Sequence, residues 1–477
     1  MSEYEAVIGL ECHVELSTAT KMFCGCRNEF GGEPNIRTCP VCLGHPGTLP
    51  VPNREAVERT MKIALALDGK VAPRSLFHRK NYFYPDMPKN YQISQYDLPI
   101  GTGGHLDVEV DGQSRRIGMN RVHLEEDTGK TIHASTTGRI AEADYALEDY
   151  NRAGLPLVEV VSEPELRSPE EARAYLQELR ALLEALGVSD VRMEEGSLRC
   201  DANVSVRPAG REELGTKVEI KNMNSIRSVE RAVRFEIDRQ REALDRGEPL
   251  VQETRHWDED RGVTTSLRSK EEAFDYRYFP EPDLPPLEPD EEWIAKLRAS
   301  LPELPAARRR RLVESLELSP EQARILTSEP GWADLFEEAV EASGQLGRSV
   351  ANWFTQTLMP QVPLERAAGR ADTVAKVLRL VSDGEISSTA GKEVLVEAIA
   401  SGRSPSDVVD ERGLRQISDL GDVIDRVIAE NPGPVGQFRG GKEGVLGFLV
   451  GQVMKETGGA ANPQEAQRVL RERLGPG

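Results

Sequence analysis

The stretch YEAVIGLECHVEL (residues 4–16) decides the fold, because apolar and polar residues alternate along it. Alternation with a period of two is typical of a β-strand that places one face on a core and the other toward solvent. The apolar positions are Tyr4, Ala6, Ile8, Leu10, Cys12, Val14 and Leu16. The other face carries Glu5, Val7, Gly9, Glu11, His13 and Glu15.

Glu11 and His13 therefore point the same way and can act together. Side chains two residues apart on one strand face start about 7 Å apart. A carboxylate and an imidazole at that spacing can converge on one divalent cation or one phosphate group. A solvated strand face with ordinary polar residues explains the same pattern, so the strand alone leaves both interpretations open.

A second alternating run, GSLRCDANVSVRP (residues 196–208), predicts another strand of the same kind. Asp201 lies on its polar face, and that face also carries Arg199, Asn203, Ser205 and Arg207. The face is a candidate second wall of a site. A surface strand with paired opposite charges is the alternative.

Two further acidic segments carry candidate ligands. Glu159 lies in the otherwise apolar run LPLVEVVSEP (residues 155–164), and a buried carboxylate is costly unless it is paired or bound to metal. A structural salt bridge explains Glu159 equally well. The run VHLEEDTGK (residues 122–130) has three consecutive carboxylates, and periodicity leaves both Glu125 and Glu126 as candidates to face a site.

Four of the six cysteines, Cys24, Cys26, Cys39 and Cys42, have a spacing suited to tetrahedral zinc. Four thiolates leave no open coordination position, so we expect a structural zinc site that folds the loop and does not catalyse. Four independent thiols are the alternative. Cys12 and Cys200 fall on the apolar faces of their strands, and we expect neither to be a nucleophile.

The loop RKNYFYPDMPKNYQISQ (residues 79–95) combines aromatic and basic residues, which suits stacking on a base or ribose and pairing with phosphate. A loop whose rings are packed into the core is an equally good interpretation. The sequence lacks the phosphate-binding pattern GxxxxGK[ST], so any nucleotide chemistry is not of the P-loop type.

The composition predicts a multidomain protein without a membrane span. The net charge of −20 argues against non-specific nucleic-acid binding, although residues 431–477 carry six basic and four acidic residues. The N-terminus lacks the pattern of a signal peptide, and no stretch approaches the roughly 18 apolar residues of a membrane span. We therefore expect a cytoplasmic location.

Periodicity and punctuation predict an α+β protein with three domains. Residues 1–290 are expected to form a large mixed cradle domain with an antiparallel sheet. The Pro-rich acidic segment FPEPDLPPLEPDEEW (residues 279–293) is interpreted as a linker. Helical spacing of apolar residues then predicts an all-α domain over 291–404 and a small α-helical tail domain over 405–477.

Several of these segments together resemble the B subunits of the glutamyl-tRNA(Gln)/aspartyl-tRNA(Asn) amidotransferases. The resemblance runs essentially from end to end and is carried by IGLECHVEL, RKNYFYPDMPKNYQISQ, HLEEDTGK, DYNRAGLPLVEVVSEP, MEEGSLRCDANVSVRP, KNMNS and DYRYFPEPDLP. The pattern D-x-N-R-x3-P-L-x-E, which begins at Asp149 and ends at Glu159, is long enough to make a chance match improbable.

The resemblance implies an ATP-dependent ligase. Such an enzyme phosphorylates the side-chain carboxylate of Glu or Asp on a misacylated tRNA, and ammonia then displaces the phosphate. The resemblance places Mg²⁺ among residues that match the metal ligands of the family, namely Glu11, His13, Glu126, Glu159 and Asp201. Zinc at the four cysteines rests on their spacing, because some members of the family lack them.

The resemblance also implies partners. Ammonia would come from a glutaminase partner, the A subunit, with a small C subunit completing a heterotrimer, and the tail domain would contact tRNA. A zinc-stapled tRNA-binding protein without catalysis of its own remains an alternative, as does a free-standing carboxylate–amine ligase.

Overall fold

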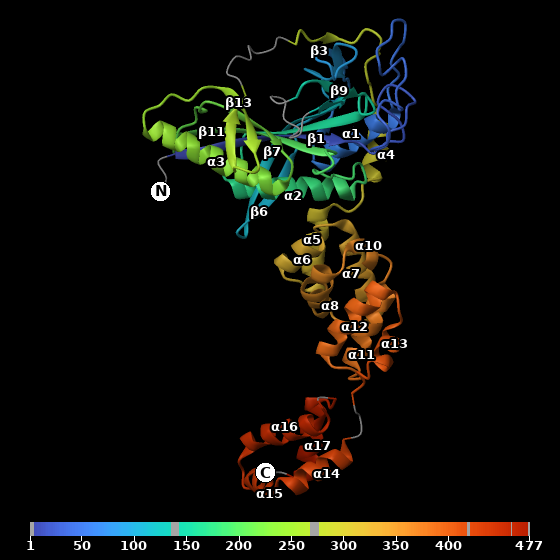
Figure 1. Ribbon diagram of the computed structural model, residues 1–477, viewed down its shortest axis with the longest axis vertical. Helices are drawn as coiled ribbons and strands as arrows, with labels where there is room; N and C mark the ends of the chain where they lie inside the picture. Colours follow the sequence, from blue (N-terminus) through green and yellow to red (C-terminus); the bar gives the residue numbers. More distant parts are fainter. Residues whose placement is uncertain (1–3, 135–142, 268–275, 417–419, 459, 476–477) are drawn as a thin grey trace. The chain divides into compact units, whose positions relative to one another are not determined.

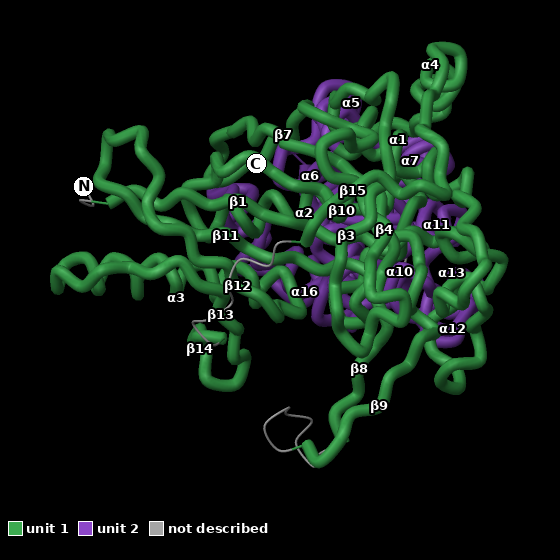
Figure 2. The backbone as a smooth tube through the Cα atoms, turned by 90° about the horizontal axis from the view of Figure 1, so that it is seen from above, with its two compact units in different colours: residues 1–305 green, residues 306–477 purple. Residues whose placement is uncertain are grey.

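The computed structural model describes residues 4–134, 143–267, 276–416, 420–458 and 460–475. These residues form two compact units, residues 1–305 and residues 306–477 (Figure 2). The first unit is built mainly on β-sheet and the second on helices, so the predicted α+β class is confirmed.

A ten-stranded sheet organises the first unit. Its strands lie in the order β14 (Val263–Ser266), β13 (Glu253–Asp258), β12 (Val218–Met223), β11 (Leu198–Pro208), β1 (Tyr4–Glu15), β10 (Pro156–Ser162), β7 (Gln113–Glu126), β5 (Gly101–Thr102) and β2 (Lys70–Val71), and β6 (His105–Val110) pairs with β7. All of these pairs are antiparallel except β12 with β13. The run that opens the sequence is therefore a central strand.

The apolar face of this sheet is covered by helices. α2 (Pro169–Ala185) and α3 (Ile226–Asp245) lie side by side along it (Figure 1). Leu10, Cys12 and Val14 on β1 are fully buried beneath them, as periodicity predicts. α2 begins at Pro169, because the Ser168 side chain accepts a hydrogen bond from the backbone N–H of Glu171 and Pro169 occupies the first turn.

Smaller elements complete the first unit. β15 (Phe279–Pro280), β3 (His78–Asn81) and β4 (Tyr91–Ser94) form a three-stranded sheet, and β8 (Lys130–His133) pairs with β9 (Ala146–Asp149). α1 (Arg54–Ala66) follows the loop that holds the four cysteines. α4 (Glu291–Ala299), which the sequence assigns to the middle domain, contributes Leu297 to the core of this first unit.

The second unit contains two separate hydrophobic cores. The first core joins α5 (Pro305–Leu316), α6 (Pro320–Leu326), α7 (Pro330–Ser343), α8 (Gly347–Trp353), the π-helix η2 (Phe354–Leu358), α9 (Met359–Gln361), α10 (Leu364–Ala367), α11 (Ala371–Ser382), α12 (Ser388–Ser401) and α13 (Pro405–Glu411). The second core joins α14 (Gly421–Glu430), α15 (Pro432–Arg439), α16 (Leu446–Glu456) and α17 (Pro463–Leu474), and the 3-10 helix η3 (Glu443–Val445) lies between α15 and α16 in the chain. Of the helices that the structure describes, none combines the length and apolarity needed to cross a bilayer.

Candidate functional site

The polar face of the large sheet gathers ionisable side chains from four neighbouring strands. The register places His13 opposite Glu159 on β10 and opposite Arg199 on β11, and Glu159 is in turn opposite His123 on β7. Residues directly opposite each other in an antiparallel sheet point to the same face. The register therefore forms a row of charged and imidazole side chains across the strands.

At the centre of this face, His13, Glu125 and Glu159 form a compact group, called here the His13 group. One possible ligand atom from each residue lies within 4.8 Å of the others. His13 Nε2 is 3.6 Å from Glu159 Oε2, and His123 Nε2 is 3.2 Å from the same oxygen. Two carboxylates and an imidazole suit a hard divalent cation, so the donor set fits Mg²⁺.

Burial and charge hold the groups around Glu159 in defined states. Burial of the His123 imidazole disfavours its charged form, but hydrogen bonds with Glu125 and Glu159 outweigh burial and raise its pKa to about 9. Burial likewise raises the pKa of Glu159, but His123, His13 and Arg121 lower it well below its usual range. Burial also raises the pKa of Glu125, and His123 lowers it by more. Both carboxylates are therefore anions at neutral pH.

Two of the predicted ligands share this face but lie outside the His13 group. Glu11 is opposite Asp201 in the register of β1 and β11. Glu11 Oε1 accepts a hydrogen bond of 2.8 Å from Asn203 Nδ2, and Lys221 Nζ is 3.3 Å from Asp201 Oδ2. Both carboxylates therefore lie near His13 on the same face. Glu11 is hydrogen-bonded to Asn203 and Asp201 is ion-paired with Lys221.

Glu126 differs from the prediction, because the structure does not bring it to this face. Consecutive residues of a strand point to opposite faces, and Glu125 is the one that points to His13. Glu126 Oε1 accepts a hydrogen bond of 2.8 Å from the backbone N–H of Ile93 and forms a buried ion pair with Lys89. Of Glu125 and Glu126, the geometry supports Glu125 as the candidate metal ligand.

A carboxyl pair that the sequence analysis missed borders the His13 group. Burial and the neighbouring Asp127 raise the pKa of Glu15 to about 8. Burial also acts against ionisation of Asp127, but Arg199 and Arg152 overcome it and lower the pKa of Asp127 to about 2. Arg199 Nη2 lies 2.9 Å from Asp127 Oδ2, so one wall of the site carries a fixed guanidinium.

A cavity of about 300 Å³ opens beside His13. Its walls include Lys80, Tyr82 and Tyr276 together with Arg199. Lys80 Nζ lies 4.8 Å from the centre of the Tyr276 ring, and Tyr82 stacks on Tyr84 with ring centres 5.7 Å apart. Part of the aromatic loop thus faces a cavity instead of the core.

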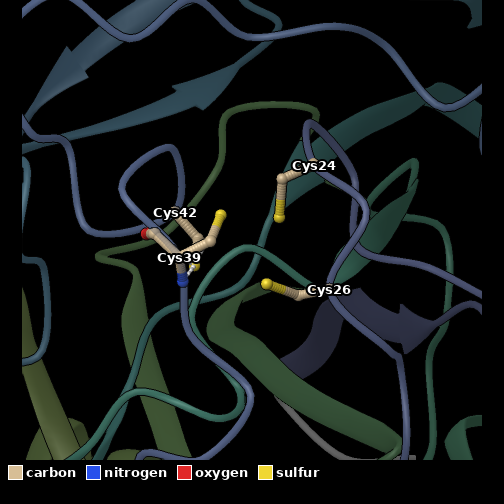
Figure 3. A group of neighbouring side chains, drawn as sticks. All are labelled: Cys24, Cys26, Cys39 and Cys42. Carbon is tan, nitrogen blue, oxygen red and sulfur yellow. Dashed lines mark hydrogen bonds between the residues drawn. The ribbon is translucent and has the colours of Figure 1, made fainter.

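The four cysteines converge as their spacing predicts. Cys24 and Cys26 come from one arm of the loop, Cys39 and Cys42 come from the facing turn, and their sulfur atoms point toward a common centre (Figure 3). All four Sγ atoms lie within 4.8 Å of one another. We call this group the cysteine cluster. A set of four thiols without other ligand types suits tetrahedral zinc.

One thiol of the cysteine cluster is predisposed to ionise. A hydrogen bond from Cys24, together with the positive charge of Lys21, lowers the pKa of Cys42 to about 5. The Lys21 side chain is fully buried and its Nζ lies 3.9 Å from Cys42 Sγ. Cys12 and Cys200, by contrast, are buried on the apolar face of the sheet, as predicted, with their Sγ atoms 3.8 Å apart.

Comparison with known proteins defines the class of this fold and site. Residues 6–295 match the family described as the GatB/GatE catalytic domain, and residues 334–474 match the GatB domain. The first match contains the polar face, the His13 group and the cysteine cluster.

Full-length relatives specify the class further. The chain is 54% identical to the aspartyl/glutamyl-tRNA(Asn/Gln) amidotransferase B subunit of Carboxydothermus hydrogenoformans, with 99% of each chain covered. It is 55% identical to the protein of the same name from Moorella thermoacetica, with 99% of this chain and 100% of the relative covered. The chain therefore belongs to the family of aspartyl/glutamyl-tRNA(Asn/Gln) amidotransferase B subunits.

Proposed function

We propose that this chain converts Glu-tRNA(Gln), Asp-tRNA(Asn) or both into the corresponding Gln-tRNA or Asn-tRNA. In the first step, an oxygen of the side-chain carboxylate attacks the γ-phosphorus of ATP, and the bond to the leaving ADP breaks. In the second step, ammonia attacks the carbonyl carbon of this acyl phosphate, loses a proton and expels inorganic phosphate. The observation that carries the proposal is the His13 group on the polar face of a GatB/GatE catalytic domain.

The His13 group would hold Mg²⁺, and Glu11 and Asp201 on the same face would complete its surroundings through direct or water-mediated contacts. Bound there, Mg²⁺ would reduce the repulsion between the attacking carboxylate and the γ-phosphate. This proposal keeps four of the ligands expected from the resemblance and replaces Glu126 with Glu125.

Arg199 and Lys80 would orient the substrate carboxylate. Both side chains line the cavity beside His13, and Asp127 fixes the guanidinium of Arg199 from behind. A pre-positioned cation lowers the entropic cost of bringing two anionic groups together. His123 would hold Glu159 and Glu125 in place through its two contacts.

The cysteine cluster would bind a structural zinc ion. Four thiolate ligands close the coordination sphere, so this ion would stabilise the loop and take no part in either reaction step. The fully buried Lys21 supports the assignment, because its charge would partly balance that of the thiolates.

Ammonia would be delivered by a glutaminase partner, the A subunit, within a heterotrimer that also contains a small C subunit. The names of the relatives, which designate a B subunit, support such an assembly. We further propose a cytoplasmic protein with a cradle domain that extends past the expected boundary at 290 to include α4, a helical domain of α5 to α13, and a tRNA-binding tail of α14 to α17. The separate core of α14 to α17 supports the role of the tail, as does the excess of basic over acidic residues in 431–477.

The test uses the reconstituted heterotrimer with Glu-tRNA(Gln), glutamine and [γ-³²P]ATP. We expect His13→Ala to lose both the phosphorylated intermediate and Gln-tRNA formation while tRNA binding is retained. Glu236→Gln is the control, because Glu236 is a buried, ion-paired carboxylate of α3 on the opposite side of the sheet. Unchanged turnover by His13→Ala would instead favour a tRNA-binding protein without catalysis.

A further inference from the structure

Three tyrosine rings, of Tyr276, Tyr278 and Tyr96, lie in contact beside the cavity at His13, and we call them the tyrosine platform. Tyr276 lines the cavity itself. Its ring packs edge-on against Tyr278, with ring centres 6.0 Å apart. Tyr278 in turn stacks on Tyr96 at 4.5 Å, with 12° between the ring planes. The platform therefore leads from the cavity to the surface, where Tyr96 is 59% exposed.

The small sheet of β15, β3 and β4 assembles the tyrosine platform from two distant segments of the chain. Tyr96 lies two residues past the end of β4, and Tyr278 directly precedes β15. His78 of β3 is buried and packs edge-on against Tyr96, with ring centres 6.2 Å apart. Tyr278 and His78 thus hold the Tyr96 ring in place while more than half of the residue stays exposed.

The backbone between the two tyrosines of the second segment is strained. Arg277 has a φ of 45°, in the left-handed region that residues other than glycine rarely adopt. The Asn81 side chain holds this turn, because its Nδ2 donates hydrogen bonds of 3.1 Å to the carbonyl of Tyr276 and 2.9 Å to that of Arg277. Such a conformation is costly and persists only where the surrounding contacts enforce it, as they commonly do at ligand sites.

The tyrosine platform also lies close to the proposed reaction centre. Burial raises the pKa of Tyr278 above its usual range, and the nearby carboxylates of Glu125 and Glu159 add to the rise. Both carboxylates belong to the His13 group. A ligand that rests on the platform would therefore have one end near that group.

Cations lie next to the tyrosine platform, although the chain as a whole is acidic. Lys80 Nζ lies 4.8 Å from the centre of the Tyr276 ring, and the exposed Arg277 separates Tyr276 from Tyr278 in the chain. Aromatic rings with cations beside them suit a single-stranded nucleic acid, because bases stack on the rings and phosphates pair with the cations.

We propose that the tyrosine platform stacks the unpaired bases at the 3′ end of the aminoacyl-tRNA. This inference rests on the proposed function, in which the reacting amino acid is esterified to the terminal ribose of that end. Because the amino acid would enter the cavity beside His13, the attached nucleotides must leave past its walls, of which Tyr276 is one. Stacking on aromatic rings tolerates any base, so other contacts need not read the sequence of this end.

The experiment measures KM for Glu-tRNA(Gln) and KM for ATP in the reconstituted heterotrimer. We expect Tyr96→Ala to raise KM for Glu-tRNA(Gln) about 5- to 150-fold, the contribution of one stacked base, and to leave KM for ATP unchanged. Tyr96→Phe keeps the ring and should keep both values at the wild-type level. An unchanged KM for Glu-tRNA(Gln) in Tyr96→Ala, or a comparable rise in KM for ATP, would overturn the inference.

Tyr145→Ala is the matched control, because Tyr145 is similarly exposed (61%) and lies outside the tyrosine platform. It should leave both KM values unchanged, and an effect equal to that of Tyr96→Ala would contradict the inference.

A substrate with an abasic nucleotide at each unpaired 3′ position in turn tests the stacking without relying on a variant protein. At one position the wild-type complex should show a raised KM, and Tyr96→Ala should then add little, because both changes remove the same contact. Independent effects at every position would overturn the inference.

Failure of the wild-type complex to phosphorylate Glu-tRNA(Gln) is a different result, because it would remove the proposed function itself. The Kd for the tRNA, measured without ATP, would still compare wild type with Tyr96→Ala. Equal Kd values in that comparison would overturn the platform as well.

Discussion

The cysteine cluster and the His13 group both bring metal-binding side chains within 4.8 Å of one another, but they are assembled in different ways. The cysteine cluster comes from a single loop between Cys24 and Cys42. The His13 group comes from β1, β7 and β10, whose members are far apart in the sequence. A site that folds a loop can be encoded locally, whereas a site that holds two substrates needs the rigidity and breadth of a sheet.

The two regions also differ in the ligands that they offer to a metal ion. Four thiols can close the coordination sphere of an ion, whereas one imidazole and two carboxylates leave positions open for phosphate oxygens. The comparison predicts that damage to the His13 group reduces the rate with the fold intact. Substitutions in the cysteine cluster should lower the fraction of folded protein. The overall rate should then fall only in proportion to that fraction.

The largest effect on rate is expected for Glu159→Gln. Glu159 is only 9% exposed and contacts both His13 and His123, so its charge cannot be replaced by water. We expect kcat for Gln-tRNA formation to fall by at least about 10²- to 10³-fold, as for other losses of transition-state electrostatics. A melting temperature equal to that of wild type would show that kcat falls because the reaction is impaired and not because the protein unfolds. A wild-type kcat for Glu159→Gln would contradict the catalytic role given to the His13 group.

Cys39→Ser should act on the other region. We expect the chain to lose stoichiometric zinc, with an affinity at least about 100-fold lower, because even loss of an outer-shell partner costs about 10- to 100-fold. Limited proteolysis should then cut the loop around residues 24–42, and the remaining folded protein should keep its kcat. Metal analysis of the purified variant provides the check, and wild-type zinc content would contradict a four-thiolate site.

The smallest effect is expected for Ser168→Ala at the start of α2, which supports the sheet from its apolar side. The Ser168 hydroxyl accepts a hydrogen bond of 3.1 Å from the backbone N–H of Glu171, and loss of such a cap costs about 1 kcal/mol. Urea unfolding should show this decrease in the free energy of unfolding. Activity should be unchanged, and a drop in kcat comparable to that of Glu159→Gln would mean that the helix acts on the site.

Local patterns in the sequence predicted the scaffold well. Alternation placed Leu10, Cys12 and Val14 on the face of a strand that the structure buries. The cysteine spacing likewise predicted which sulfur atoms would meet, because all four lie in one loop.

The site was harder to predict because its contacts depend on strand pairing. Nothing in the run of three carboxylates decides between Glu125 and Glu126 until β7 is paired with β10 in register. His123 was missed, although it shares its strand face with Glu125 and that alternation was a usable signal. The contact of Glu15 with Asp127 joins β1 to the end of β7 and has no local signature.

The measurement that tests the account most directly is the Mg²⁺ dependence of phosphoryl transfer from [γ-³²P]ATP to Glu-tRNA(Gln), compared between Glu125→Gln and Glu126→Gln. The two substitutions change adjacent residues in the same way, but only Glu125 belongs to the His13 group. We predict that Glu125→Gln raises the Mg²⁺ concentration for half-maximal rate by about tenfold or more. Glu126→Gln, which leaves Lys89 without its carboxylate, should leave that concentration unchanged. A shift for Glu126→Gln together with a wild-type response of Glu125→Gln would contradict the assignment of the metal to this face of the sheet.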